Sequence, residues 1–320
     1  MLPNLAELEE ASEIVYRTMP PTPQFSWPLL NEWLGVDAWI KHENHTPLGA
    51  FKVRGGLVYF DRQADRLKNS PGVICATRGN HGQSVAFAAS RNGIASTIVV
   101  PHGNSSEKNA AMRGLGATLV EHGDDFQESL EFAQRKANNE GLVMVPSFDP
   151  LLVAGVATYS MELFRCVSEL DVLYVPIGLG SGICGAIAAK KALGLSIEIV
   201  GVVSSRARAY SESFSQGRSI ECPVTTQVAD GMACRKPNDD SLPIILEEVN
   251  RIAEVSDEEV TQAIREIYRC THNVAEGAGA ASIAAIKKDS QLLQGKQVAG
   301  VLCGANIDSS VLANVLRSVE

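Results

Sequence analysis

The sequence lacks several features that mark common classes of protein. No uninterrupted apolar run reaches the roughly 18–20 residues that a membrane-spanning helix needs. Basic residues are not in excess, since 28 Lys and Arg stand against 37 Asp and Glu, and the formal net charge is −9. This balance argues against nucleic-acid binding, which requires a basic face to neutralise phosphates. The N-terminal segment carries acids where a signal or transit peptide would carry bases. We therefore expect a soluble, cytoplasmic protein with neither a membrane nor a nucleic acid as partner.

Closely spaced cysteines are also missing. The seven cysteines are dispersed, and the two closest, Cys222 and Cys234, are too far apart for the CxxC spacing of zinc sites and redox motifs. An odd, scattered set indicates free thiols in a reducing compartment. We expect most of them to be buried as small apolar side chains.

No internal repeat, low-complexity tract or Gly/Ser linker interrupts the 320 residues. Hydrophobic residues make up 45% of the chain, which is enough for a sizeable core in two lobes around a shared cleft. Nothing follows the last strand–helix pair in the sequence. We therefore expect no additional regulatory domain.

Strand-like and helix-like segments alternate along most of the chain. Short β-branched runs, typical of buried parallel strands, occur at residues 73–77, 96–101, 117–122, 142–146, 172–177, 198–203 and 298–304. Ala-rich amphipathic stretches that end in glycine, typical of helices, lie between them at 84–93, 107–116 and 129–141. This alternation predicts an α/β protein with two lobes, each a mainly parallel sheet covered by helices, and ligand sites at the carboxyl ends of the strands.

A glycine-rich turn, GLGSGICG, follows the strand predicted at 172–177. Its glycines at 178, 180 and 182 allow successive backbone N–H groups to face one anion, and a helix beginning near Ile183 adds the positive end of its dipole. The turn therefore predicts a phosphate site. The same letters satisfy the dinucleotide pattern GxGxxG, so an NADP-binding oxidoreductase remains an alternative at this point. A close-packed turn without a ligand is the other alternative.

A lysine lies among small and apolar residues in the segment HTPLGAFKVRGG, just ahead of a predicted helix. Lys52 is either a surface side chain whose amine reaches water, or a desolvated amine of lowered pKa that forms a Schiff base with an aldehyde cofactor. The local sequence does not decide between them.

The third motif, RGNHGQS, connects the end of another predicted strand to a helix. Asn80 and His81 project from a tight turn whose free N–H groups suit a carboxylate or an aromatic hydroxyl. The alternative makes Asn80 a helix N-cap and His81 a solvated turn residue. Two later segments carry single polar groups: Glu276 in EGAGA, and Cys303 directly after the last strand. Taken alone, Glu276 would be an acidic residue at the start of a helix, and Cys303 would be a small buried side chain of the core.

Together, AFKVRGG, RGNHGQS, VPIGLGSGICG, EGAGA and LCGAN occur in one order across most of the chain. This combination resembles the fold-type II pyridoxal-phosphate enzymes, in the branch of the threonine/serine dehydratases and serine racemases. The resemblance implies a larger pyridoxal-phosphate-binding domain of residues 1–62 plus 151–320 and a smaller, substrate-side domain of residues 72–149. It also implies pyridoxal 5′-phosphate as the cofactor, in the cleft between them.

The resemblance assigns a role to each motif residue. Lys52 would bind the cofactor aldehyde and act as the catalytic base, with Phe51 packed on the ring. The phosphate would lie on Gly178, Leu179, Gly180, Ser181 and Gly182. Asn80 would contact the ring hydroxyl, and Cys303 would lie at the pyridine nitrogen. Thr77, Asn80 and His81 would receive the substrate carboxylate.

The chain departs from the family pattern at several of these positions. Leu179 interrupts a loop that usually holds four glycines, and Ala50 replaces the serine common before the Phe–Lys pair. Cys303 stands where many relatives have serine. Because a thiol donates hydrogen bonds weakly, the pyridine should stay largely unprotonated and the cofactor should be a moderate electron sink, which suits elimination.

Arg78 occupies the position at which racemases of this branch carry a proton-donating serine. Arginine stays protonated, so racemisation is disfavoured, and Arg78 is expected to grip a carboxylate unless it faces solvent. The acids that bind a divalent cation in relatives correspond to Val203 and Ala209. Neither side chain can ligate a hard cation, so we expect no metal there.

The expected activity is a β-eliminating deaminase, or ammonia-lyase, that converts a 3-hydroxy-L-amino acid such as L-threonine or L-serine into a 2-oxo acid and ammonia. A specialised substrate is the main alternative: phenylserine, a hydroxyectoine-derived amino acid, or hydroxyaspartate. Arg78 favours hydroxyaspartate, whereas Ser129 disfavours it because relatives that bind a second carboxylate have arginine there. Family members are commonly dimers, so a homodimer is possible.

Three other functions fit less well. β-Replacement enzymes of the cysteine-synthase type usually have threonine in place of His81. An NADP oxidoreductase leaves Lys52 and the RGNHGQS turn without a role. A non-catalytic binding protein leaves the combination of Lys52 and a phosphate loop unexplained.

Overall fold

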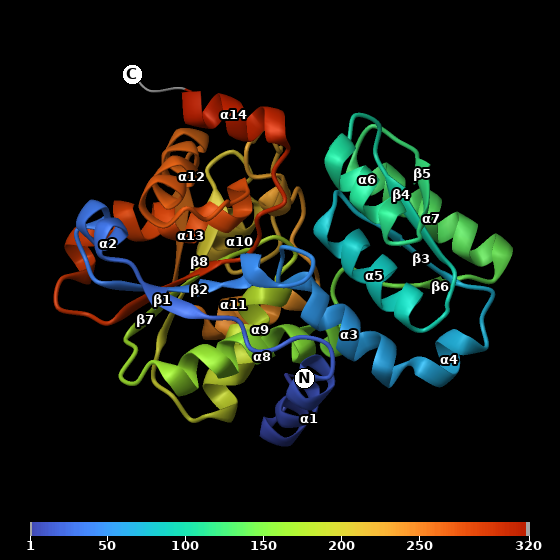
Figure 1. Ribbon diagram of the computed structural model, residues 1–320, viewed down its shortest axis with the longest axis horizontal. Coiled ribbons are helices and arrows are strands. Elements are labelled where there is room, and N and C mark those ends of the chain that lie inside the picture. The colour runs from blue at the N-terminus through green and yellow to red at the C-terminus, as the bar shows by residue number, and fades with distance from the viewer. Residues whose placement is uncertain (1, 318–320) are drawn as a thin grey trace.

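The computed structural model describes residues 2–317 as an α/β protein with two lobes, each built on its own sheet (Figure 1). The larger sheet has the strand order β1-β2-β10-β7-β8-β9, and it is parallel except for the antiparallel pair β1–β2. The smaller sheet has the order β5-β4-β3-β6 and is parallel throughout. The fold class predicted from the sequence is confirmed.

We call the larger sheet and its helices the large lobe. Its strands are β1 (Gln24–Ser26), β2 (Ala38–His42), β7 (Val172–Pro176), β8 (Glu198–Ser204), β9 (Arg251–Val255) and β10 (Val298–Leu302). Its helices are α1 (Leu5–Tyr16), α2 (Pro28–Leu34), α8 (Pro150–Cys166), α9 (Ser181–Ala192), α10 (Ala209–Gln216), α11 (Ser241–Glu248), α12 (Asp257–Thr271), α13 (Gly277–Lys288) and α14 (Ser309–Arg317). Short 3-10 turns occur at η1 (Glu43–His45), η2 (Asp230–Met232) and η3 (Ser290–Leu293).

The small lobe lies at the right of Figure 1. It contains β3 (Val73–Ala76), β4 (Ser96–Val100), β5 (Thr118–Glu121) and β6 (Val143–Met144), with α4 (Ala64–Lys68), α5 (Asn80–Arg91), α6 (Ser106–Gly114) and α7 (Phe126–Glu140). One apolar cluster joins α5 and α6 to the sheet, and a second cluster lies under α7. The central strand β3 is buried along its whole length, as its continuous apolar run predicts.

Helix α3 (Lys52–Arg62) connects the lobes, and glycines let it approach its neighbours closely. A Cβ atom on Gly56 would lie 2.2 Å from Ser84 Oγ in α5, and one on Gly155 in α8 would lie 2.3 Å from the carbonyl oxygen of Arg54. Real Cβ contacts are never this short, so both positions need glycine at this helix spacing. Helix α3 therefore packs against the small lobe through α5 and against the large lobe through α8.

The structure corrects several details of the sequence prediction. Helix α9 begins at Ser181 rather than near Ile183, and Lys52 is the first residue of α3 rather than a residue ahead of it. Strands β1, β2 and β9 were not predicted. The three glycines expected to end helices do so with left-handed φ: Gly141 is the C-cap of α7, and Gly93 and Gly116 directly follow the caps of α5 and α6.

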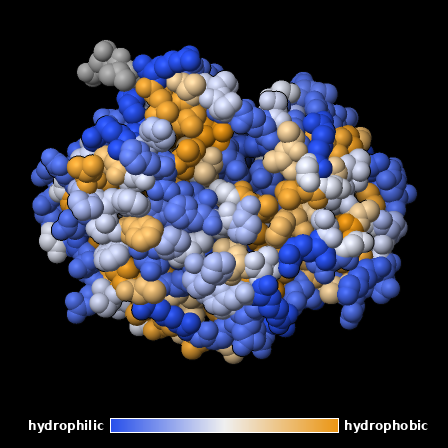
Figure 2. Space-filling view, in the orientation of Figure 1, coloured by the Kyte–Doolittle hydropathy of each residue, from blue (hydrophilic) through white to orange (hydrophobic). Residues whose placement is uncertain are grey.

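The face drawn in Figure 2 is mostly hydrophilic, and a notch marks its upper edge between the lobes. No helix within residues 2–317 is long and apolar enough to cross a membrane. A pocket at the junction of the lobes is lined by Leu48 and Asn306 of the large lobe and by Gln83 and Leu115 of the small lobe.

Candidate active site

Three loops that follow parallel strands meet at the junction of the lobes. They follow β3 in the small lobe and β7 and β10 in the large lobe. Each sheet has a point from which successive strands are added in opposite directions. In the small sheet this point is β3, with β4 on one side and the later β6 on the other. In the large sheet it is β7, with β8 on one side and the later β10 on the other. Ligands of open α/β sheets bind at such points. The motifs after these strands are thus brought together, as the sequence predicts.

Lys52 begins α3 and directs its amine towards the glycine-rich loop. Its Nζ donates a hydrogen bond to Ser181 Oγ at 2.8 Å and lies 5.1 Å from the centre of the Phe51 ring. Burial lowers the pKa of Lys52 to about 8, although the nearby Cys303 acts in the opposite direction. A substantial fraction of the amine is therefore neutral near pH 8 and able to accept a proton or attack a carbonyl.

The chain before Lys52 is held against the end of β10. The Phe51 N–H donates to the carbonyl of Cys303 at 3.0 Å, and the Ala305 N–H donates to the carbonyl of Gly49 at 2.8 Å. These backbone bonds fix the lysine beside the Cys303 thiol. Burial, with the neighbouring Glu276, raises the pKa of that thiol, which therefore stays protonated and is a weak donor.

The glycine-rich loop, which we call the cradle, leads into the N-terminus of α9. Gly180 has a left-handed φ of 100°, and a Cβ on Gly178 would lie 2.5 Å from the carbonyl oxygen of Gly231. Ser181 and Gly182 begin the helix, so their N–H groups have no intrahelical acceptor. Leu179 is partly buried and packs against the core of the large lobe. Free N–H groups at a helix N-terminus are the kind of donors that bind a phosphate.

An aromatic wall closes one side of this cradle. Phe51 meets Tyr159 of α8 edge to face with ring centres 6.2 Å apart, and Tyr159 donates its hydroxyl proton to the carbonyl of Gly182 at 3.2 Å. Tyr159 was not singled out from the sequence. It lies within a long apolar helix where only its tertiary contacts distinguish it from other core residues.

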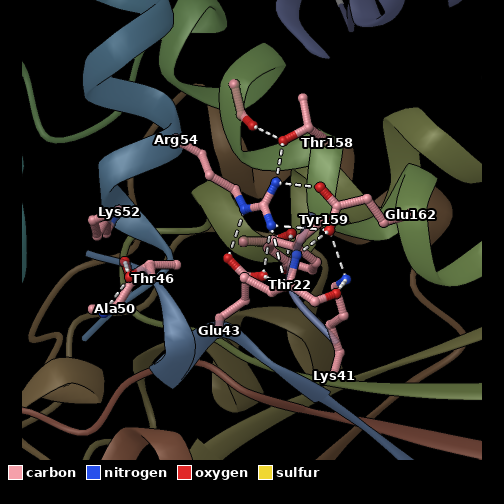
Figure 3. A network of polar contacts seen from close by, with 12 residues as sticks. Thr22, Lys41, Glu43, Thr46, Ala50, Lys52, Arg54, Thr158, Tyr159 and Glu162 are labelled. Carbon is pink, nitrogen blue, oxygen red and sulfur yellow. Dashed lines mark hydrogen bonds and ion pairs between the residues drawn. The ribbon is translucent and has the colours of Figure 1, made fainter. Parts of the chain in front are cut away.

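A buried ionic network fixes α3 one half-turn beyond Lys52 (Figure 3). The Arg54 guanidinium binds Glu43 with two hydrogen bonds, of 2.7 and 2.9 Å, and binds Glu162 at 2.6 Å. Lys41 also binds Glu162 at 2.6 Å. The side chains of Arg54 and Glu43 have no exposed surface. This network, which was not predicted, connects η1 and β2 to α3 and α8.

The turn after β3 is organised by Thr77. Its Oγ1 accepts hydrogen bonds from the N–H groups of Gly79 at 2.9 Å and Gly82 at 3.3 Å. Burial, together with the nearby Lys52, lowers the pKa of His81 to about 3, so the ring is neutral. His81 Nε2 is buried and has no hydrogen-bond partner among the described residues.

Asn80 is the first residue of α5, and Gly79 takes the cap position. The Asn80 side-chain amide donates to Glu276 Oε1 at 2.6 Å, and the Asn80 side-chain oxygen accepts from Asn306 Nδ2 at 2.8 Å. Asn80 is therefore not a helix N-cap. Glu276 occupies the cap position of α13 but does not cap it, since its carboxylate faces Asn80 and Lys108 instead. The sequence marked Glu276 by its small neighbours, whereas no local signal marks Lys108.

Arg78 is partly buried at the same turn, and its buried Nε has no hydrogen-bond partner within the part of the chain that the structure describes. Ser129, by contrast, lies in α7, and its hydroxyl donates to the carbonyls of His122 and Asp125, which precede that helix. Over residues 2–317 no group of three or more His, Cys, Asp or Glu side chains is arranged to hold a metal ion.

Comparison with known proteins identifies the family. A family model described as "Pyridoxal-phosphate dependent enzyme" matches residues 15–304. The chain is 34% identical to an L-threonine ammonia-lyase from Geobacter sulfurreducens over 97% of its length and 77% of that protein. It is 29% identical to an L-threo-3-hydroxyaspartate ammonia-lyase from Saccharomyces cerevisiae over 100% of its length and 98% of that protein.

Solved structures agree with these relatives. The maize serine racemase structure superimposes with a TM-score of 0.91 at 26% identity, covering 98% of this chain and 97% of that one. The resemblance stated from the sequence is confirmed, and with it the cofactor and the ammonia-lyase class. The chain belongs to the pyridoxal-phosphate dependent enzymes, as a fold-type II member of the branch that contains the threonine/serine dehydratases and the serine racemases.

Proposed function

We propose that this enzyme eliminates the β-hydroxyl and then the amino group of a 3-hydroxy-L-amino acid, giving a 2-oxo acid and ammonia, with L-threonine or L-serine as substrate. The observation that supports this reaction is the Lys52 amine, which has a pKa of about 8 and points at Ser181 in the phosphate cradle. An amine that is partly neutral near physiological pH can remove an α-proton. The relatives that are named threonine ammonia-lyases support the substrate.

The residues at the site fit pyridoxal phosphate. The N–H groups from Gly178 to Gly182 would hold the phosphate, Lys52 would take the aldehyde, and Phe51 would lie against the ring. Asn80 would face the ring oxygen, and Cys303 would face the pyridine nitrogen. When bound, the cofactor supplies an electron sink for the negative charge that develops at the substrate α-carbon.

The chain's own groups would orient the substrate and move its protons. We assign the carboxylate to the turn of Thr77, Asn80 and His81, because Thr77 keeps a hydroxyl proton to donate and a neutral His81 places no second charge there. Lys52 Nζ would receive the α-proton. Ser181, 2.8 Å from Nζ and 2% exposed, would hold the amine in place while excluding water.

The proposal is tested with the purified, cofactor-loaded enzyme and a panel of 3-hydroxy-L-amino acids. We expect ammonia and the matching 2-oxo acid from L-threonine or L-serine, with a change in the visible absorbance of the enzyme. Lys52→Ala should lose product formation, whereas Lys190→Ala, at a partly buried lysine near the end of α9, should retain it. A wild type that binds the cofactor yet releases neither product from any member of the panel overturns the proposal.

A second candidate substrate is a 3-hydroxyaspartate, because Arg78 offers a cation with an unpartnered Nε at the substrate turn. A second carboxylate would pair with that guanidinium. We expect Arg78→Ala to raise KM for 3-hydroxyaspartate about tenfold or more, while KM for L-threonine changes little. An equal effect on both substrates would assign Arg78 to the shared α-carboxylate, and no effect on either would place it outside the site.

Three further features remain proposals. We propose that residues 1–62 plus 151–320 form the cofactor-binding domain and that 72–149 form the substrate-side domain. The strands of the smaller sheet all lie between 73 and 144, which supports this division. A homodimer in the cytoplasm is proposed from the family resemblance and the dispersed free cysteines.

A further inference from the structure

A buried cation reaches from the small lobe to two carboxylates of the large lobe. Lys108 lies in the first turn of α6, and its Nζ is 2.6 Å from Asp230 Oδ2 in η2 and 3.4 Å from Glu276 Oε2 at the start of α13. The lysine is 8% exposed and Glu276 is 2% exposed. Because Lys108 and Glu276 are both buried, removing either one would leave the other as an uncompensated charge at the contact between the lobes.

The lysine stem also covers the turn after β3. A Cβ on Gly79 would lie 2.5 Å from Lys108 Cδ, so the stem passes directly over the glycine that precedes Asn80. The position of Lys108 is therefore fixed by packing at one end and by two carboxylates at the other. The stem thus packs α6 against the turn after β3.

Glu276 transmits this contact to Asn80. Its Oε1 accepts the Asn80 amide proton at 2.6 Å, and its backbone N–H donates to the carbonyl of Gly304 at 3.0 Å. Asn306 completes the arrangement by donating to the Asn80 oxygen at 2.8 Å. Both ends of the Asn80 amide are thus bound, so its orientation depends on Glu276. We call Lys108, Asp230, Glu276, Asn80 and Asn306 the interlobe cluster.

The charge balance of the cluster depends on Lys108. Burial is the largest effect and, with Asp230, raises the pKa of Glu276 above its ordinary value, while Lys108 and the Asn80 hydrogen bond limit the rise. The two carboxylates share a single cation, and the remaining members of the cluster are neutral amides. Without Lys108, Glu276 would be a buried carboxylate facing Asp230 without a cation, and it would take up a proton at higher pH.

We propose that Lys108 is a positioning residue that binds Glu276 and Asp230 and keeps the small lobe closed on the large lobe, so that the Asn80 amide is held facing the site. This assignment rests on the proposed function only for the role of Asn80. The contact between the lobes does not depend on the proposed reaction, and it can be measured without substrate turnover.

The first experiment compares hydrogen exchange in the wild type, Lys108→Met, Lys108→Arg and Lys136→Met, with and without cofactor. We expect Lys108→Met to speed exchange over residues 77–114 by about tenfold or more. Lys108→Arg keeps the charge and should restore much of the protection. Lys136→Met removes a lysine of the same lobe whose partner, Glu140, lies one turn away on the same helix, so it should leave exchange unchanged.

The second experiment measures the pH dependence of kcat/KM. We expect the acid limb of the profile to shift in opposite directions in Lys108→Met and Asp230→Asn. Lys108→Met should move the acid limb to higher pH, because Glu276 loses its cation. Asp230→Asn should move the limb to lower pH, because Glu276 loses a neighbouring negative charge while Lys108 remains. The Asp230 side chain is 37% exposed, so this variant tests the inference even where Lys108→Met folds poorly. Lys136→Met should keep the wild-type profile.

Each outcome decides the inference. Faster exchange over 77–114 in Lys108→Met, reversed by arginine, supports it even when no substrate is turned over, so failure of the proposed function leaves this readout intact. Unchanged exchange, or limbs that shift in the same direction for Lys108→Met and Asp230→Asn, overturns it. Equal loss of protection throughout the chain would reduce Lys108 to a purely structural residue, which also overturns it.

Discussion

At the scale of single residues, the site separates a reactive amine from groups that stay neutral. Lys52 is desolvated beside Ser181, and the nearest ionisable side chains, His81 and Cys303, are themselves held uncharged by burial. An ammonium ion at Lys52 therefore has no close anion to stabilise it. Its pKa falls because nothing offsets the loss of water, whereas Lys108, with two carboxylates, has a raised pKa.

This contrast gives a titration that can be measured on the cofactor-free protein. Below pH 8 Lys52 is mostly protonated and unreactive, and above it the amine is free, so arylation by trinitrobenzenesulfonate should reach half its maximal rate near pH 8. Peptide mapping would follow Lys52 separately from the exposed lysines, whose ordinary pKa is about 10.4. In urea the Lys52 midpoint should rise to that ordinary value. A midpoint near 10 in the folded protein would mean that the amine is hydrated.

The residue types at the site could be predicted from the sequence, but their partners could not. Lys52, Asn80 and Cys303 stand out because small residues surround them and strands precede or follow them. Lys108 and Asp230 are ordinary charged residues in polar segments, and they matter only because folding places them at Glu276 from opposite lobes. Contacts across more than a hundred residues leave no local pattern.

At the scale of elements, the strands with uninterrupted apolar runs were predicted and the others were not. Strand β2 lies inside the larger sheet, yet it contains Lys41 and His42, both without exposed surface. Lys41 is tolerated because it binds Glu162 and the carbonyl of Thr22. Strand β9 is at the sheet edge and includes Arg251 and Glu254, which pair with groups outside it. A buried charge with distant partners breaks the apolar pattern that identifies a buried strand.

The close approach of α3 and α8 gives a prediction at this scale. Gly155→Ala would place Cβ 2.3 Å from the Arg54 carbonyl oxygen and 2.8 Å from Gly55 Cα, so the helices must separate. We expect the free energy of unfolding to fall by about 1–3 kcal/mol, as in overpacked cores, and cofactor retention to weaken because α3 carries Lys52. Urea unfolding and visible absorbance would measure the two effects.

A matched control is available in α6. Gly114 is the last residue of that helix, and its φ is not left-handed. A Cβ added there would meet no heavy atom within 4 Å beyond the neighbouring backbone of its own helix. Gly114→Ala should therefore be neutral or stabilise the protein by up to about 1 kcal/mol, since alanine loses less backbone entropy on folding. Equal destabilisation at both positions would show that close helix contact is not the cause at Gly155.

At the scale of the whole molecule, the active site exists only where the lobes meet. The large lobe supplies the phosphate cradle and Lys52, and the small lobe supplies the turn of Thr77, Asn80 and His81. Helix α3 carries Lys52 and packs on both lobes, and the interlobe cluster is a second contact between them. The general layout follows from alternating strands and helices, whereas the angle between the lobes is set by these specific contacts.

The network around Arg54 fixes one end of this layout. The side chains of Lys41, Glu43 and Glu162 are almost wholly inaccessible to solvent. Removing Arg54 therefore leaves two buried carboxylates, of Glu43 and Glu162, with Lys41 as the remaining cation of the network. We expect Arg54→Met to lower the free energy of unfolding by about 3–5 kcal/mol at neutral pH. Arg17→Met, which breaks an exposed pair with Asp61, should cost at most about 1 kcal/mol.

The pH dependence separates an electrostatic origin from lost packing. Burial raises the pKa of Glu162, but Arg54 and Lys41 outweigh it and hold the pKa below its ordinary value. In the wild type, Glu162 therefore stabilises the fold above its unfolded-state pKa, and this stability is lost as the pH falls through the lower folded-state value.

In Arg54→Met the folded-state pKa of Glu162 rises, so Glu162 becomes neutral on mild acidification and the variant recovers part of its lost stability. Urea unfolding at about pH 7 and about pH 5 should show a smaller difference from wild type at the lower pH. A difference that stays constant with pH would assign the loss to the missing guanidinium contacts alone, and the network would then not act through its charges.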